Sequence, residues 1–175
     1  AKVSACVHEL RSHGYAILDF SGGQKSRVSV VTKLLAKKEN LAAQVHDRVR
    51  FRLVLSTPAE LLAILDALMT RIIPFNYIVP GQSQNSLIDL ATLTPLSSHA
   101  QVTPRTNEFS GPSFRTINFV ADMPLRVPPE LSALRGNGED LGRIIFALTE
   151  WQLVDAATAR ANEQGENNHD RYKAR

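Results

Sequence analysis

The segment IIFALTEWQLV, residues 144–154, has the pattern of a buried β-strand and decides the fold. Its side chains are almost continuously apolar, which is typical of a strand inside a sheet. Glu150 interrupts the run and shares one face with Gln152, whereas Trp151 and Leu153 take the other face. A buried carboxylate is costly unless it is paired or bound to a metal. Glu150 therefore indicates either a polar outer face or a paired, functional carboxylate.

The segment VRFRLVLS, residues 49–56, predicts a second strand because its apolar and polar positions alternate. Its apolar residues form one face, and Arg50 and Arg52 lie on the other, partly basic face. Asp47 comes just before this strand. It can be read as a solvent-facing charge at a strand end, or as a rigidly held ligand for a hard cation such as Mg²⁺.

Periodicity and turn residues divide the rest of the chain into short elements. We expect helices at residues 3–14, 26–38 and 57–73, and strands at residues 15–20, 75–79 and from 113 onward, where the strand can continue past Pro124. Two long connections, residues 79–112 and 122–142, are interpreted as insertions, the first with a short helix at 86–93. This order predicts one α/β or α+β domain around a mixed sheet. The first residue is Ala1 rather than Met, which leaves open whether the native chain is longer.

Composition excludes several classes of protein. With 20 basic and 17 acidic residues the net charge is +3, well below that of a typical nucleic-acid module. No apolar run approaches the roughly 18 residues of a membrane span, and no signal peptide is visible. The single cysteine, Cys6, excludes an internal disulfide framework. We therefore expect a cytoplasmic protein without a membrane partner; the oligomeric state is left open.

The segment GGQKSR, residues 22–27, predicts a turn that leads into a helix. Glycines let the backbone approach a ligand, and a helix N-terminus with nearby lysines favours phosphate. Lys25, Ser29 and Lys33 follow at four-residue spacing and so share one helical face. A solvated basic stripe would have the same pattern, so both interpretations stay open.

Four motifs, two of them in two parts, resemble in chain order the synthetase domain of the RelA/SpoT homologues, the (p)ppGpp synthetases. They are GGQKSRVSVVTK (residues 22–33), DRVRFR (47–52), NYI with SFRTIN (76–78 and 113–118), and EWQLVD with NEQGENNHDRYK (150–155 and 162–173). The last pair is the most specific, and the resemblance spans residues 20–173 apart from the two insertions.

The resemblance implies an α+β, nucleotidyltransferase-like fold with a mixed, mostly antiparallel sheet of about five strands flanked by helices. It also implies transfer of the β,γ-pyrophosphate of ATP to the 3′-hydroxyl of GDP or GTP. Asp47 and Glu150 would be the catalytic residues and would hold Mg²⁺, with Glu150 also activating the acceptor hydroxyl.

By the same resemblance, Arg52 would lie against the adenine of ATP and Lys25, Ser29 and Lys33 would contact its phosphates. Phe114 would stack on the acceptor base. The other residues expected around the acceptor are Gln152, Glu163, His169 and Tyr172, the last three from a C-terminal helix.

The chain departs from the family pattern at several motif positions. Gly23, Asn76 and Asn118 stand where the family has Arg, Asp and His, and Phe114 replaces a Tyr. The residues expected to bind the metal and the triphosphate match the family motifs better than the residues expected to bind the acceptor. The expected function is an alarmone-type pyrophosphokinase with a purine nucleotide acceptor. The alternatives are an inactive nucleotide-binding or regulatory homologue, and a toxin-type enzyme that modifies the 3′ end of tRNA.

Overall fold

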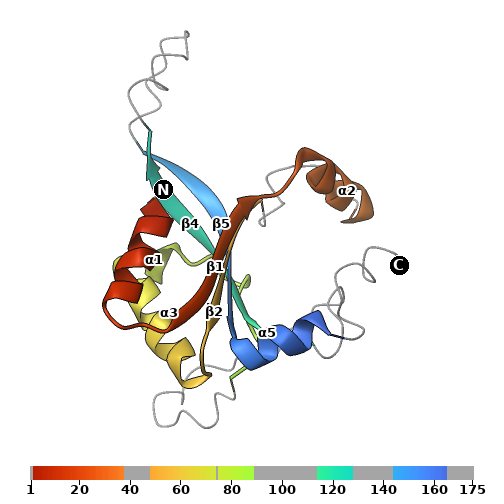
Figure 1. The fold of residues 1–175 in the computed structure, drawn as a ribbon. Coiled ribbons are helices and arrows are strands. Elements are labelled where there is room, and N and C mark those ends of the chain that lie inside the picture. Colours follow the sequence, from red (N-terminus) through yellow and green to blue (C-terminus); the bar gives the residue numbers. More distant parts are fainter. Residues whose placement is uncertain (1, 38–47, 74, 89–113, 128–143, 165–175) are drawn as a thin grey trace.

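The computed structural model describes the chain except residues 1, 38–47, 74, 89–113, 128–143 and 165–175. The described strands form one sheet in the order β1-β2-β5-β4-β3 (Figure 1). They are β1 (Ile17–Gln24), β2 (Val49–Leu55), β3 (Gln84–Asn85), β4 (Ile117–Arg126) and β5 (Ile144–Asp155). The helical elements are α1 (Lys2–Ser12), α2 (Arg27–Lys37), α3 (Ala59–Arg71), α5 (Ala156–Glu163) and the 3-10 turn η2 (Phe75–Tyr77).

The sheet is mixed and mostly antiparallel, which confirms the predicted α+β class. Strands β2 and β5 are parallel, whereas the β1–β2, β5–β4 and β4–β3 pairs are antiparallel. Strand β5 is therefore central and pairs with a strand on each side; its second half is mostly buried, whereas Ile144, Ile145 and Phe146 at its start are exposed. No helix among the described residues has the length and hydropathy to cross a membrane.

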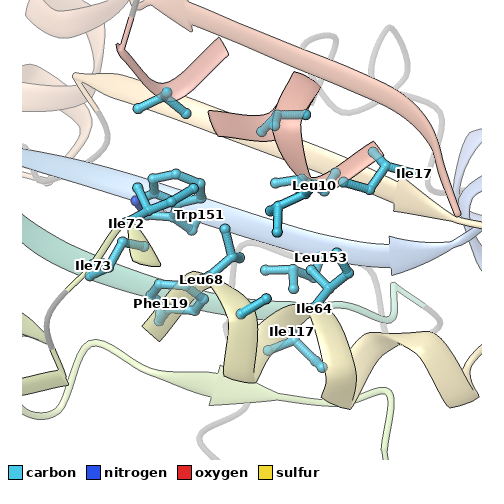
Figure 2. Packing of buried hydrophobic residues seen from close by; sticks show 14 of the residues in the cluster. Leu10, Ile17, Ile64, Leu68, Ile72, Ile73, Ile117, Phe119, Trp151 and Leu153 are labelled. Carbon is cyan, nitrogen blue, oxygen red and sulfur yellow. The ribbon is translucent and has the colours of Figure 1, made fainter. Parts of the chain in front are cut away.

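The hydrophobic core lies between one face of the sheet and the helices α1 and α3 (Figure 1). Helix α1 contributes Val3, Val7 and Leu10, whose three- and four-residue spacing places them on one side of the helix. The buried residues of α3 are Leu61, Ile64, Ala67 and Leu68. Figure 2 shows side chains from both helices packed against Trp151 and Leu153 of the central strand.

Four aromatic rings cross this core face, one from each of the neighbouring strands β1, β2, β5 and β4. Ring centroids are 6.1 Å apart for Phe20 and Phe51, 4.7 Å for Phe51 and Trp151, and 6.3 Å for Trp151 and Phe119. Gly22 leaves room for this row, because a Cβ there would lie 2.7 Å from the Phe51 ring. Only glycine fits at this position without a shift of the ring.

The predicted turn at residues 22–27 is partly wrong, because both glycines belong to strand β1. Gly22 pairs with Phe51 and Gly23 with Arg50 in the antiparallel ladder. The register with β2 and the Phe51 ring packed on Gly22 keep both residues in the strand, so tertiary contacts override the local turn preference. The chain leaves the sheet after Gln24, and α2 begins at Arg27.

Strand β4 continues through residues 122–126. The predicted start of the second insertion, at residue 122, is therefore wrong. Pro124 is tolerated inside the strand because it lacks only an N–H group, and such a gap is acceptable at a sheet edge. The short β3 pairs only with Ile117 and Asn118, which leaves the Pro124 end of β4 at the edge of the described sheet.

One shorter element also differs from prediction, and a second lies mostly outside the described residues. The strand expected at residues 75–79 contains the 3-10 turn η2, and only Ile78 forms a bridge, to Ala121. An antiparallel continuation of this bridge would place residues 75–77 opposite residues 122–124 of β4, where Pro124 has no N–H group to donate. Residues 86–88 are bends, and the Asn85 side chain accepts hydrogen bonds from the backbone of Leu87 and Ile88, as an N-cap residue does at the start of a helix. Residues 89–93 lie outside the described part of the chain.

Helix α5 begins directly at the end of β5 with Asp155 as its N-cap. The buried Asp155 carboxylate accepts hydrogen bonds from the backbone N–H groups of Ala157 and Thr158, each at 3.0 Å. Burial alone would raise the pKa of Asp155, but the hydrogen bonds from Thr158 and Ala157 outweigh it and hold the pKa below its usual value. The cap therefore stabilises the fold in its ionised form.

Asp155→Ala is expected to lower the free energy of unfolding by about 1 kcal/mol at neutral pH, because it removes the cap. Since the folded pKa is depressed, this stabilisation is full above the unfolded pKa of about 4 and disappears as the pH falls through the folded pKa. Urea unfolding of both proteins at neutral and acid pH measures the difference. A gap between wild type and variant that widens on acidification would contradict the assignment.

Candidate active site on the open face of the sheet

The sheet face opposite α1 and α3 carries a cluster of polar side chains on three adjacent strands. The register pairs Arg50 of β2 with Glu150 of β5, and pairs Gln152 of β5 with both Arg52 and Asn118. Paired residues point to the same side of a sheet, so these five side chains gather on one face. We call them the open-face cluster. The alternation in sequence predicted this face for Arg50, Arg52, Glu150 and Gln152, and the register confirms it.

Glu150 is the centre of the open-face cluster and is buried. Its Oε2 accepts a hydrogen bond from Arg50 Nε at 2.8 Å. Its Oε1 accepts hydrogen bonds from Asn118 Nδ2 at 2.9 Å and from Gln152 Nε2 at 3.1 Å. Side chains from β2, β4 and β5 thus converge on one carboxylate. Of the two interpretations of Glu150, the paired carboxylate is the one that the structure supports.

The contact with Glu150 fixes the orientation of the Asn118 amide. Its nitrogen must face Glu150, since the amide oxygen would be repelled by the carboxylate. The Asn118 oxygen is consequently buried without a hydrogen-bond partner among the described residues. Buried acceptors without partners are uncommon and mark places where an ion, a water molecule or a ligand group is accommodated. The cluster therefore contains an unsatisfied oxygen on the residue that holds the carboxylate.

The donor set around Glu150 is compatible with Mg²⁺ in combination with a phosphate ligand. Magnesium sites in phosphate chemistry use one or two carboxylates, with the remaining ligands from phosphates and water. Each carboxylate oxygen has two lone pairs, and Oε2 accepts one hydrogen bond in the described structure. The described residues contain no group of three or more His, Cys, Asp and Glu side chains that could hold a metal alone. Asp47, the second predicted ligand, lies outside the described residues.

Arg52 connects the open-face cluster to the end of helix α5. Both terminal nitrogens of its guanidinium lie 3.4 Å from Glu163 Oε1. The Glu163 side chain is exposed, so this pair stabilises the fold by at most about 1 kcal/mol. A ligand can therefore displace it at little cost. Arg52 was predicted to bind the adenine of ATP, and Glu163 was predicted to lie near the acceptor nucleotide. Their contact places the residues predicted for ATP next to those predicted for the acceptor.

Asn162 holds the segment after Phe114 against α5. The buried Asn162 amide accepts a hydrogen bond from the Arg115 backbone N–H at 3.1 Å and donates one to the Arg115 carbonyl at 2.8 Å. Phe114, the predicted base-stacking residue, is half-buried immediately before this clamp. The two hydrogen bonds thus fix the backbone that carries Phe114 next to the helix that carries Glu163.

Of the predicted triphosphate residues, Ser29 and Lys33 belong to α2, whereas Lys25 precedes the helix, so the prediction that all three share one helical face is wrong. The Lys25 backbone N–H donates to the Arg48 carbonyl at 2.8 Å, so Lys25 sits beside the beginning of β2. Ser29 is exposed in the first turn of α2, where its backbone N–H donates to the Ser26 hydroxyl at 3.2 Å. Lys33 lies further along the same helix. In Figure 1, α2 and α5 both lie on the side of the sheet away from α1 and α3.

Sequence reasoning missed the contributions of Arg50 and Asn118. Arg50 was recognised only as part of a basic strand face, and Asn118 only as a departure from a family motif. Their contacts with Glu150 follow from the β2–β5 and β4–β5 registers, which no local pattern encodes. His169 and Tyr172 lie outside the described residues.

The fold matches solved structures of small alarmone synthetases. Small alarmone synthetase 1 from Bacillus subtilis bound to its product pppGpp is 14% identical, with a TM-score of 0.63 over 99% of this chain and 73% of that chain. The same synthetase bound to AMPCPP is 12% identical, with a TM-score of 0.56 over 99% and 71%. A GTP pyrophosphokinase family protein from Streptococcus pneumoniae is 13% identical, with a TM-score of 0.53 over 99% and 74%.

No protein-family model and no curated protein sequence matches the chain. Identities of 12–15% to the solved structures show similarity of fold. The chain therefore has the mixed α+β, RelA/SpoT-like fold of the alarmone synthetases.

Proposed function

We propose that this protein is an ATP-dependent pyrophosphokinase of the alarmone-synthetase type. It moves the β,γ-pyrophosphate of ATP to the 3′-hydroxyl of a purine nucleotide. The observation that carries the proposal is the buried Glu150, held by side chains from three strands on the open face of this fold. Solved structures of similar fold bound to pppGpp and AMPCPP support nucleotides as partners.

The proposed transfer requires a base that takes the proton of the acceptor hydroxyl, and positive charge that neutralises the transferred pyrophosphate. The acceptor 3′-oxygen forms a bond to the β-phosphorus of ATP, and the bond from that phosphorus to the α,β-bridging oxygen breaks, so AMP leaves. The hydroxyl proton passes to the Glu150 carboxylate and then to solvent. Mg²⁺, when bound, neutralises phosphate charge, and Glu150 and Asp47 are the residues proposed to hold it. Gln152 and Asn118 keep the carboxylate in place through hydrogen bonds to Oε1.

ATP and the acceptor are proposed to bind on either side of Glu150. Arg52 faces the adenine once ATP displaces Glu163 from its guanidinium, and a cation over an aromatic ring is favourable. Lys25, Ser29 and Lys33 contact the phosphates. The residues proposed for the acceptor are Phe114, Gln152, Glu163, His169 and Tyr172.

Purified protein with Mg²⁺ and ATP is expected to release AMP only when an acceptor nucleotide is present. GDP, GTP, ADP, AMP and excess ATP are tried in turn, and mass spectrometry checks that the acceptor gains one pyrophosphoryl group. Absence of AMP with every nucleotide, although Mg²⁺–ATP binds, would overturn the proposal in favour of a nucleotide-binding module. Transfer of γ-labelled phosphate to tRNA alone would replace the nucleotide acceptor by a tRNA 3′ end.

A further inference from the structure

Glu150 needs a positive partner, because a carboxylate removed from water is costly without one. The Glu150 side chain is 9% exposed, and Arg50 approaches it with its Nε at 2.8 Å. Asn118 and Gln152 supply dipoles rather than charge. Among the described residues that hydrogen-bond to Glu150, Arg50 therefore supplies the positive charge.

The two oxygens of Glu150 are held in different ways. Oε1 accepts from two amide groups, whereas Oε2 accepts from Arg50 within the described structure. The amides of Asn118 and Gln152 would keep the carboxylate in position if Arg50 moved away. Oε2 is thus the oxygen that can change its partner without loss of the orientation of Glu150.

Arg50 is also the partner that water can reach. Its side chain is 44% exposed, whereas that of Glu150 is 9% exposed. A guanidinium on a long side chain can turn to solvent or to an anionic ligand while its stem stays on the sheet. A divalent cation bound to Glu150 Oε2 would repel the Arg50 guanidinium, because the two positive charges would then lie only a few ångströms apart.

We propose that Arg50 is the resting counter-ion of Glu150 and that it competes with a divalent cation for Oε2. The cation displaces the guanidinium, which then faces the open side of the sheet, where the polyphosphate of ATP is proposed to lie. The competition rests on one part of the proposed function, the divalent cation at Glu150. Its consequence is a free protein with low metal affinity, in which metal loading depends on an anion that draws Arg50 away.

Mn²⁺ titration without nucleotide, followed by electron paramagnetic resonance, tests the competition. Arg50→Gln is expected to bind Mn²⁺ about tenfold more tightly than wild type, because one positive charge beside the ion is removed. Arg50→Lys keeps the charge and should bind as weakly as wild type. Adding Glu150→Gln to Arg50→Gln should abolish the gain, which places the ion at Glu150.

Arg126→Gln is the matched control. It removes the same charge from the exposed end of β4, and its Mn²⁺ affinity should equal that of wild type. Thermal unfolding gives a second readout if Arg50→Gln is poorly folded without ions, because Mn²⁺ should raise its Tm more than that of wild type. Equal Mn²⁺ affinity of Arg50→Gln and wild type, or an equal gain in Arg126→Gln, would overturn the competition.

The assay for AMP separates this inference from the proposed function. If wild type makes AMP and Arg50→Gln has unchanged Mn²⁺ affinity, only the competition is overturned. If Arg50→Gln gains affinity and the protein makes no AMP with any acceptor, only the pyrophosphokinase is overturned.

Discussion

Glu150→Gln is expected to lower the rate of AMP formation by about three orders of magnitude or more. The change removes a base, which is worth about 10²- to 10⁴-fold, and also removes the charge that would hold a metal against the phosphates. Glutamine keeps the size of glutamate but carries an amide that cannot accept from Arg50, Asn118 and Gln152 together. Single-turnover release of AMP at saturating ATP and acceptor measures the effect on the chemical step.

Asp122→Asn is the control for this prediction. Asp122 is an acidic residue of β4 on the same face of the sheet as Asn118, and its strand partner is Leu148 rather than Glu150. Its loss should leave AMP release within about twofold of wild type, as is usual for surface changes away from the reacting atoms. Circular dichroism melting of both variants separates lost chemistry from lost folding. A Glu150→Gln protein that is folded and retains a tenth of wild-type activity would remove Glu150 from the catalytic step.

The two strands that build the site could be predicted from the sequence because their patterns are local. Alternation in residues 49–55 separates Arg50 and Arg52 from the apolar residues, and the same period places Glu150 and Gln152 on one face of β5. The period of two is a property of the extended backbone itself. The face of each side chain was therefore predictable, and the structure agrees.

The pairing of these strands could not be predicted in the same way. Arg50 and Glu150 are 100 residues apart, and their contact depends on the parallel register of β2 and β5. A shift of one residue would turn Glu150 away from Arg50, and nothing local to either strand excludes that shift. The ion pair at the centre of the site is thus a tertiary feature that single-sequence patterns do not contain.

Local signals failed where packing outweighs propensity. The Gly-Gly pair reads as a turn in sequence, but Gly22 is a strand residue whose missing side chain makes room for the Phe51 ring. The insertion predicted to begin at residue 122 was wrong at its start, because β4 continues through Pro124, at a position where the strand needs no donor. The family motifs predicted roles for Glu150 and Gln152 but not the hydrogen bonds that these side chains make. Asp47, His169 and Tyr172, which lie outside the described residues, stay predictions.

Trp151→Ala is expected to have the largest effect on stability, lowering the free energy of unfolding by about 3–5 kcal/mol. The Trp151 side chain is 0% exposed on the central strand and lies between the rings of Phe51 and Phe119. The alanine variant leaves a cavity under the strand that carries Glu150 on its opposite face. Urea unfolding followed by circular dichroism measures the change, since Trp151 is the only tryptophan and its fluorescence is lost in the variant.

Trp151→Phe and Thr149→Val separate packing from hydrogen bonding at this position. The Trp151 Nε1 donates to Thr149 Oγ1 at 3.0 Å, and Thr149 Oγ1 donates to the Ala121 carbonyl at 3.1 Å, so the indole is tied to the β4–β5 pair. Thr149→Val leaves the buried indole N–H without a partner and should cost about 1–3 kcal/mol. Trp151→Phe keeps most of the ring volume and should cost less than Trp151→Ala. If Trp151→Ala costs less than about 1 kcal/mol, the aromatic row does not support the strand that presents Glu150, and the site depends on its own hydrogen bonds instead.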